Sequence, residues 1–402
     1  MPQHPQPNAQ SSWGAVFAMS LAAFALVASE FMPVSLLTPI AADLHVSEGQ
    51  AGQGIAVSGL FALITSLLIA AVAARVDRKR LLLSLTLLMI VSGSVVAFAP
   101  NYTTFMLGRA LIGIAIGGFW SLSAATAMRL VPAGEVTRAL AIVNGGNALA
   151  TVIAAPLGSY LGALIGWRGA FLCVVPVALL ASLWLLVSMP AIKTPTVAAS
   201  GNLMRLMRRP PVALGMLAVS LFFMGQFMLF TYLRPFLESV TQVSVSMLSL
   251  MLLVLGVAGL VGTLLIEALL KKGLYRTLIA IPMLMAVIAL ALISFGSSTL
   301  GTMLLLGLWG LVATAAPVGW WTWLARTLPD DAEAGGGLMV AVIQLAIAAG
   351  ATLGGLLFDF SGYRATFEVS ALLLLIAAGL AVLASGSAPA RDEVGTFNKS
   401  VD

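Results

Sequence analysis

Residues 13–37 read WGAVFAMSLAAFALVASEFMPVSLL, an apolar run that contains a single charged side chain, Glu30. A helix of this length crosses a bilayer, which needs about 20 apolar residues. A charged group at that depth is costly and usually faces a protein interior or an aqueous cavity. The alternative is a structural acid paired with a buried arginine or hydroxyl. We therefore predict a membrane-spanning helix in which Glu30 is a proton or substrate site.

The composition of the whole chain indicates a membrane protein. Of its 402 residues, 60% are hydrophobic and 9% are charged, against about 25% charged residues in a soluble domain. The net charge of +5 is spread over short loops, with no basic stripe or nucleic-acid motif, so no nucleic-acid partner is expected. The single Cys173 excludes an intramolecular disulfide, and His4 and His45 fall outside the apolar runs. We expect no metal site and no cofactor.

Apolar runs separated by polar or Gly/Pro breaks predict an all-α integral membrane protein. The twelve expected helices lie near 13–37, 50–73, 81–99, 103–128, 137–163, 168–189, 212–236, 244–270, 275–295, 300–325, 336–359 and 365–386. One long polar segment, residues 191–211, separates the first six helices from the last six. The predicted order is a tail at 1–12, a six-helix bundle at 13–190, a linker at 191–211, a second six-helix bundle at 212–386, and a tail at 387–402.

Basic residues predict the orientation in the membrane. With the N-terminus inside, sixteen Lys and Arg fall in cytoplasmic segments, whereas Arg168, Arg234 and Arg364 fall on the opposite side and Arg109 lies within a span. This positive-inside bias places both tails and the linker in the cytoplasm. The N-terminal residues lack the basic region of a cleavable signal peptide, so the first span is expected to be retained.

The two halves are related in sequence. Residues 155–171, APLGSYLGALIGWRGAF, align without a gap with residues 351–367, ATLGGLLFDFSGYRATF. Gly166 and Arg168 recur 196 residues later as Gly362 and Arg364. Parallel repeats of six spans are typical of alternating-access carriers, whose binding site lies between the halves near the midplane.

Three motifs resemble the drug-proton antiporter branch of the major facilitator superfamily. They are the basic loop DRKR at 77–80, LGRALIG at 107–113 followed by Gly117 and Gly118, and APLG at 155–158, which has Ala in place of the usual first Gly. The resemblance implies a fold of two pseudo-symmetric bundles, a cavity lined by the first, fourth, seventh and tenth spans, and a link between Arg109 and proton transfer. It also implies gating at Asp77 and Arg78. Asp359, near a predicted outer end, is interpreted as a gate or surface residue.

A closer resemblance covers about residues 13–383. The strings EFMPVSLLTP at 30–39, GGFWSLSA at 117–124, TYLRP at 231–235 and PVGWWTW at 317–323 are similar to bacterial efflux pumps for purine ribonucleosides. This resemblance implies export of nucleosides such as inosine and guanosine across the bacterial inner membrane, in exchange for protons. We expect a monomer whose partners are the substrate, the proton and the lipid bilayer.

Candidate site residues follow from the chemistry of a nucleoside. Aromatic faces stack a base, worth about 1–3 kcal/mol per base in single-stranded nucleic-acid sites, and Gln pairs with adenine-type edges. Gln226 and Gln344 are the preferred base readers, with Trp120 or Trp320 as the stacking surface. The full set of expected substrate residues is Ser29, Trp120, Ser121, Phe223, Gln226, Phe227, Tyr232, Trp320 and Gln344.

Proton coupling is assigned to Glu30 and Arg109. Burial disfavours the charged form of a carboxyl group, so Glu30 can take up a proton. If proton and nucleoside compete for the cavity, exchange results, and a proton entering down the membrane potential contributes about 2.3 kcal/mol per 100 mV. No Walker-type phosphate-binding loop is present, which favours a secondary carrier.

Other functions remain open at this point. A multidrug, sugar or metabolite exporter would use the same scaffold, and an importer would use the same proton site. An intramembrane enzyme would need a nucleophile–base pair or a metal cluster, and neither is visible. A sensor or scaffold without transport would leave the buried acid and arginine without a role.

Overall fold

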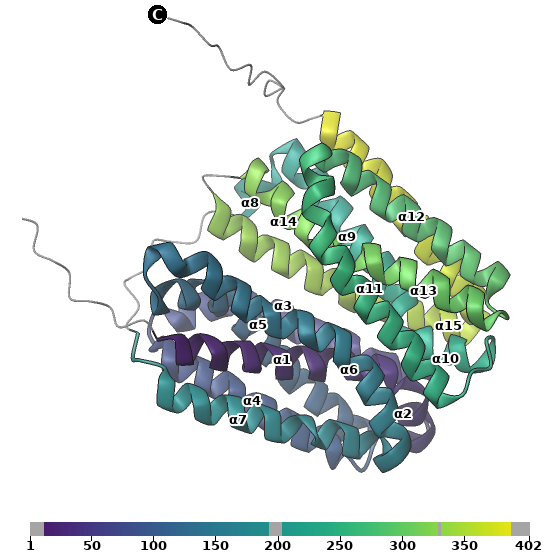
Figure 1. The fold of residues 1–402 in the computed structure, drawn as a ribbon, viewed down its shortest axis with the longest axis horizontal. Coiled ribbons are helices and arrows are strands. Elements are labelled where there is room, and N and C mark those ends of the chain that lie inside the picture. Colours follow the sequence, from purple (N-terminus) through teal and green to yellow (C-terminus); the bar gives the residue numbers. More distant parts are fainter. Residues whose placement is uncertain (1–11, 193–202, 329–330, 387–402) are drawn as a thin grey trace, which may run out of the picture.

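The computed structural model describes residues 12–192, 203–328 and 331–386, and these form an all-helical protein (Figure 1). Residues 1–11 and 387–402 of the predicted tails, and 193–202 of the predicted linker, lie outside this part. The helices are α1 (Trp13–Ser35), α2 (Leu37–Leu44), α3 (Glu48–Ala73), α4 (Arg78–Ala97), α5 (Tyr102–Leu130), α6 (Val136–Leu172), α7 (Val174–Ser188), α8 (Leu203–Met207), α9 (Pro210–Thr231), α10 (Leu233–Ser239), α11 (Val245–Lys272), α12 (Leu274–Phe295), α13 (Thr299–Ala313), α14 (Ala316–Thr327) and α15 (Ala332–Gly386), with a short 3-10 helix at Ala133–Glu135.

Two glycines convert ten long apolar helical stretches into twelve membrane crossings. Within the described residues, ten stretches are long and apolar enough to span a bilayer, and two of them cover 53 and 52 residues. A straight helix of that length would measure about 80 Å, far more than the hydrocarbon thickness of about 30 Å. Gly166 and Gly362 interrupt these two stretches with φ of 76° at both positions. Each stretch is therefore a pair of spans, and the predicted all-α fold with twelve crossings is confirmed.

The same two glycines bear out the internal repeat. They are the residues that the gapless alignment pairs, and their ψ values of 162° and −178° place both in a region of backbone conformation that only glycine occupies readily. The expected gaps between spans, 164–167 and 360–364, contain these glycines, but in the structure helix continues up to each glycine and resumes directly after it.

Three breaks between helices fall in or at the end of a predicted span. At the end of the first predicted span, α1 gives way to α2 at Leu36, whereas the seventh divides at Tyr232 (α9, α10) and the tenth at 314–315 (α13, α14). A proline lies close to each division, at Pro33, Pro235 and Pro317. Proline lacks the N–H that a helix interior requires, so helical pairing weakens around it.

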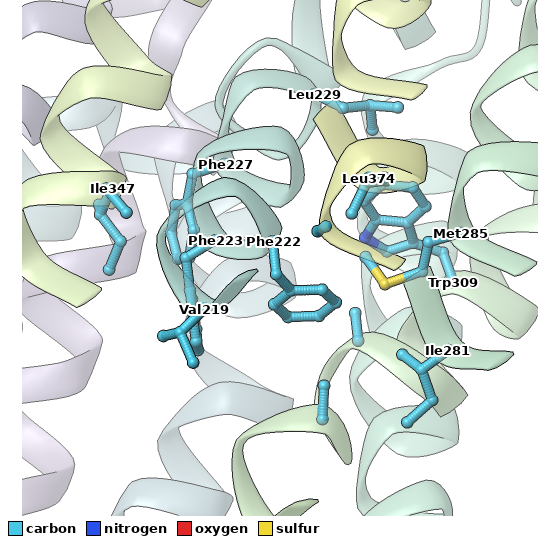
Figure 2. Packing of buried hydrophobic residues seen from close by; sticks show 14 of the residues in the cluster. Val219, Phe222, Phe223, Phe227, Leu229, Ile281, Met285, Trp309, Ile347 and Leu374 are labelled. Atoms are coloured by element: carbon cyan, nitrogen blue, oxygen red, sulfur yellow. The ribbon is translucent and has the colours of Figure 1, made fainter. Parts of the chain in front are cut away.

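Two hydrophobic cores organise the described residues. One is made almost entirely by α1–α7 and the other mainly by α9–α15. In Figure 2, Phe222 of α9 points toward Met285 and Trp309, whereas Phe223 and Phe227 lie on another side of α9 with Val219 and Ile347. Both sides of α9 are thus buried in the second core, against different helices.

The halves meet through α3 against α15 and α6 against α11. Glycines allow this approach: a Cβ on Gly256 of α11 would lie 2.8 Å from the Cα of Val152 in α6, closer than real Cβ contacts. A Cβ on Gly59 of α3 would lie 3.0 Å from the backbone oxygen of Gln344 in α15. Small residues at helix interfaces in membranes serve this purpose.

The kink at Gly362 makes a direct prediction. Replacing Gly362 with Ala forces a side chain into a glycine-only conformation, which costs about 1–3 kcal/mol. The matched control is Gly379→Ala in the same helix α15, where a Cβ meets nothing within 4 Å; there Ala should be neutral or stabilising by up to ~1 kcal/mol. Thermal unfolding in detergent, followed by tryptophan fluorescence, compares the two. Equal midpoints for both variants would contradict the role of the kink.

Candidate functional site

Glu30 lies in the buried part of α1, three residues before Pro33. Its side chain is 9% exposed, and no residue in the described part of the chain donates a hydrogen bond to its carboxylate or forms an ion pair with it. A carboxylate that is buried without a donor is poorly stabilised in its charged form. The sequence prediction of an isolated membrane acid is therefore matched by its surroundings.

Arg109 of α5 sits beside this acid and binds backbone carbonyls. Its Nη1 donates to the carbonyl oxygen of Ser29 at 2.8 Å, and its Nη2 lies 3.4 Å from that of Glu30. Its Nε donates to the carbonyl of Gly54 at 3.0 Å, and Nη2 also donates to Ser58 Oγ at 3.0 Å. One guanidinium thus ties α1 and α3 to α5 and holds a positive charge next to Glu30.

Proline explains why Ser29 needs this donor. In an intact helix the N–H of residue 33 would donate to the carbonyl of Ser29, but Pro33 has no N–H. Since an unsatisfied carbonyl in the membrane costs several kcal/mol, Arg109 supplies the missing bond. The hydrogen bonds thus show Arg109 stabilising backbone carbonyls.

A small cavity lies between the halves, one residue along α1 from Glu30. Phe31 lines it, with Gln226 and Phe227 of α9 and Trp309 of α13. The Phe31 ring stacks on Phe227 with 6.0 Å between centroids. The Gln226 Oε1 is buried and has no hydrogen-bond partner among the described residues. The remaining wall residues are Thr151, Ala155, Phe230, Leu252, Leu255, Gly310, Ala313 and Thr314.

The size of this cavity identifies a constricted conformation. Its volume is about 70 Å³, whereas ligand sites usually measure about 300–1,000 Å³. A ligand of ordinary size can enter only if the halves move apart here.

Several predicted substrate residues occupy other positions. Trp320 is buried in the second core, against Phe222 and Trp323. Phe223 is buried against Phe222, and Gln344 is buried with its Oε1 unpaired within the described residues. Three more do not line the small cavity: Ser29 is buried in α1, Trp120 is half-buried against Phe119, and the exposed Ser121 donates to the carbonyl of Gly117.

A second group of contacts joins the halves at the predicted outer end, and we call it the closure contact. Asp359 of α15 accepts hydrogen bonds from Ser47 Oγ and, at 2.9 Å, from the backbone N–H of Gly49 in the first turn of α3. Thr352 donates to Gln53 Oε1 at 3.0 Å. A carboxylate at a helix N-terminus also complements the helix dipole.

Tyr232 and Arg234 strengthen the same end. The Tyr232 hydroxyl donates to the carbonyl of Ala351 at 2.7 Å and is fully buried. Arg234 donates to the carbonyl of Ser35 at the end of α1 and pairs with Glu238 at 2.8 Å. Tyr232, expected at the substrate, instead lies in this junction between the halves.

The two remaining gate candidates lie at the start of α4. Asp77 is the N-cap of α4 and accepts from the backbone N–H groups of Lys79 and Arg80. Arg78 is buried, and its backbone N–H donates to the carbonyl of Ile192. Asp77 thus has a helix-capping role in this conformation.

Outside the membrane spans, Asp43 forms an exposed network with the Gly166 kink region. Arg168 and the Trp167 indole N–H both donate to the Asp43 carboxylate. The hydrogen bond from Arg168 is the largest cause that lowers the pKa of Asp43 below its usual value, with smaller contributions from charge and from Trp167. The C-terminal end of α2 is thereby tied to the start of the sixth span.

Sequence reasoning missed Phe31, Ser58, Thr151 and Trp309. Phe31 directly follows Glu30 and is an aromatic residue in the same motif, so the sequence carried a signal for it. Ser58, Thr151 and Trp309 come from α3, α6 and α13, and their roles depend on how those helices rotate against α1 and α5. No local sequence pattern predicts how these helices rotate.

Comparison with known proteins identifies the family to which this architecture corresponds. The model of the Major Facilitator Superfamily matches residues 19–351. A protein of Pseudomonas aeruginosa named transcription regulatory protein OpdE is 63% identical, over 96% of this chain and 97% of its own length. The purine ribonucleoside efflux pump NepI of Salmonella enteritidis is 41% identical, over 92% of this chain and 93% of its own.

Two solved structures share the fold. A bacterial homologue of the human lysosomal transporter Spinster, in an inward-facing and unoccupied conformation, matches with a TM-score of 0.76 at 16% identity, over 94% of this chain and 98% of its own. A D-xylose-proton symporter matches with a TM-score of 0.72 at 18% identity, over 92% and 96%.

The network around Arg109 predicts a specific loss of stability. In Arg109→Lys, one ammonium cannot reach carbonyls on both α1 and α3, so at least one buried carbonyl loses its donor, at a cost of about 1–3 kcal/mol. Arg326→Lys is the control, because Arg326 is exposed at the end of α14 and should change stability by less than ~0.5 kcal/mol. Unfolding midpoints in detergent measure both variants. A midpoint of Arg109→Lys equal to that of the native protein would refute the tie between the helices.

Proposed function

Because the chain belongs to the major facilitator superfamily, and is therefore a multi-pass secondary transporter and not an enzyme, we propose that it exports purine ribonucleosides such as inosine and guanosine by proton antiport. The observation that carries this proposal is the buried Glu30, which has no hydrogen-bond or ion-pair partner in the described part of the chain and lies beside a cavity of aromatic rings and Gln226. The 41% identity to a purine ribonucleoside efflux pump supports the substrate class. The same relationship supports a location in the bacterial inner membrane, and the distribution of basic residues supports cytoplasmic termini.

In this proposal, Glu30 is the proton site and Arg109 is the charge that tunes it. A proton on Glu30 removes the cost of a buried carboxylate, whereas Arg109 favours the charged form from its fixed position. A nucleoside that entered next to Phe31 would compete with the protonated state. Exchange follows if only one of the two is bound at a time.

Substrate contacts are assigned to the residues that line the interface of the halves. Phe31, Phe227 and Phe230 offer ring faces and edges for a flat base, and the free Gln226 Oε1 offers an acceptor. Trp309 also lines this cavity. Polar hydroxyls of Thr151 and Thr314 face the same space and suit the sugar.

The gating proposal rests on the closure contact. Asp359 and Arg234 bind backbone groups of the other half at the predicted outer end. In the conformation described, this end is sealed, which corresponds to a carrier that is closed toward the outside. Release of substrate outward requires these bonds to break.

A transport assay tests the proton site. In proteoliposomes, an imposed pH gradient should drive radiolabelled inosine movement for the native protein, and Glu30→Gln should abolish that drive because Gln binds no proton at this position. Exchange of inosine for inosine should survive in the variant. The control is Glu267→Gln, whose carboxylate is 76% exposed. Driven transport unchanged in Glu30→Gln would place the proton site elsewhere.

Labelling tests the closure contact. A cysteine at Phe31, in a Cys173→Ser background, should react faster with an impermeant maleimide from the outside when Asp359→Asn is added. Loss of a charged acceptor worth ~1 kcal/mol shifts the open population about fivefold. Asp331→Asn is the control, since Asp331 pairs with Arg209 within one half. Equal rates for all three proteins would exclude Asp359 as a gate.

If the transported solute is not a nucleoside, the same vesicles should give a different pattern of solute flux. A multidrug, sugar or metabolite exporter would move no inosine under any gradient but would move a lipophilic cation or a sugar. The 63% identical relative carries the name of a transcription regulatory protein, so a membrane sensor is the second candidate function. A sensor would show no flux of any of these solutes while still binding one of them.

A further inference from the structure

A second and larger cavity lies away from the site at Phe31, at the junction where α11 ends and α12 begins. Its volume is about 320 Å³. Basic residues form its rim and apolar residues its walls. Its lining is Leu269, Lys272, Gly273, Arg276, Thr277, Ala280, Ile281, Leu284 and Val312.

The two cations at the rim have no acidic partner within the described residues. Lys272 and Arg276 are exposed and form no ion pair there, whereas the neighbouring Lys271 pairs with Glu267 at 2.7 Å. The aliphatic part of Arg276 folds over Gly273, where a Cβ would lie 3.2 Å from its Cδ. Two positive charges therefore lie at one mouth, and no acidic side chain of the described ranges pairs with either of them.

The walls extend from this mouth into the membrane. From Leu274 to Leu284 is ten residues of α12, or about 15 Å, which is roughly half the hydrocarbon thickness. Leu269 and Leu284 are 50% and 41% exposed, so the groove opens sideways toward lipid. A ligand that fits must be anionic at one end and apolar along its length.

We propose that this groove binds an anionic phospholipid, with the phosphodiester between Lys272 and Arg276 and an acyl chain along Ala280 and Leu284. Basic pockets between spans on the cytoplasmic side are suited to acidic headgroups. Helix α11 also packs against α6 of the other half through Gly256, so the lipid sits on a helix of the moving interface. The proposal does not depend on which solute is transported.

Native mass spectrometry with phosphatidylglycerol measures the binding. The purified protein should retain this lipid through mild activation, and Lys272→Gln and Arg276→Gln should each weaken its binding about fivefold. Lys271→Gln, which makes the same change of charge one residue away, should bind as the native protein does. Equal weakening by all three substitutions, or by none, would overturn the site.

Two further experiments test whether the ligand is a whole lipid or only its phosphate, and whether it binds in the groove or only to the surface charges. Ala280→Phe leaves the charges intact and fills the groove at an exposed position, so it should also reduce lipid retention severalfold. Glycerol 3-phosphate should not compete at concentrations that exceed the lipid a hundredfold. Competition by glycerol 3-phosphate, or full retention in Ala280→Phe, would show that no acyl chain is bound and would reject the proposal.

Discussion

The carbonyl of Ser29 is the constraint on which the centre of the protein depends. Pro33 leaves it without an intrahelical donor, and the bilayer offers no water to replace that donor. Arg109 reaches across from α5 to supply the bond and, from the same guanidinium, binds α3. A single missing N–H thus determines where a buried cation lies, and Glu30 shares its position because it is the next residue after Ser29.

This arrangement separates two roles that a buried arginine can have. Direct pairing with the Glu30 carboxylate would fix the acid in its charged form and resist protonation. Binding to backbone instead leaves the carboxylate without a donor among the described residues and only influenced by the nearby charge. A proton site needs that freedom, since its two states must be close in free energy.

Much of the fold was predictable because it follows from composition and repetition. Apolar runs revealed the spans, and the alignment of Gly166 with Gly362 indicated that the halves share one plan, which equal φ values then confirmed. The site was less accessible to prediction. Gln226 and Phe227 were expected at the cavity and lie there, but Tyr232 and Trp320 lie in a junction and in a core. Which face of an apolar helix turns inward is decided by packing between helices distant in sequence, and periodicity is weak where lipid and core are both apolar.

The bond from Arg234 to the carbonyl of Ser35 has a consequence for how easily the outer end opens. Arg234 keeps Glu238 as a partner when the halves separate, because both belong to α10. The Ser35 carbonyl lies at the end of α1, at the predicted outer end, where water can replace its donor once the halves separate. Breaking this one bond therefore exchanges a protein donor for a water molecule, at a net cost of only about 0.5–1.5 kcal/mol. The remaining resistance to opening comes from the other bonds of the closure contact, which Asp359 and Thr352 form with α3 and the residues before it.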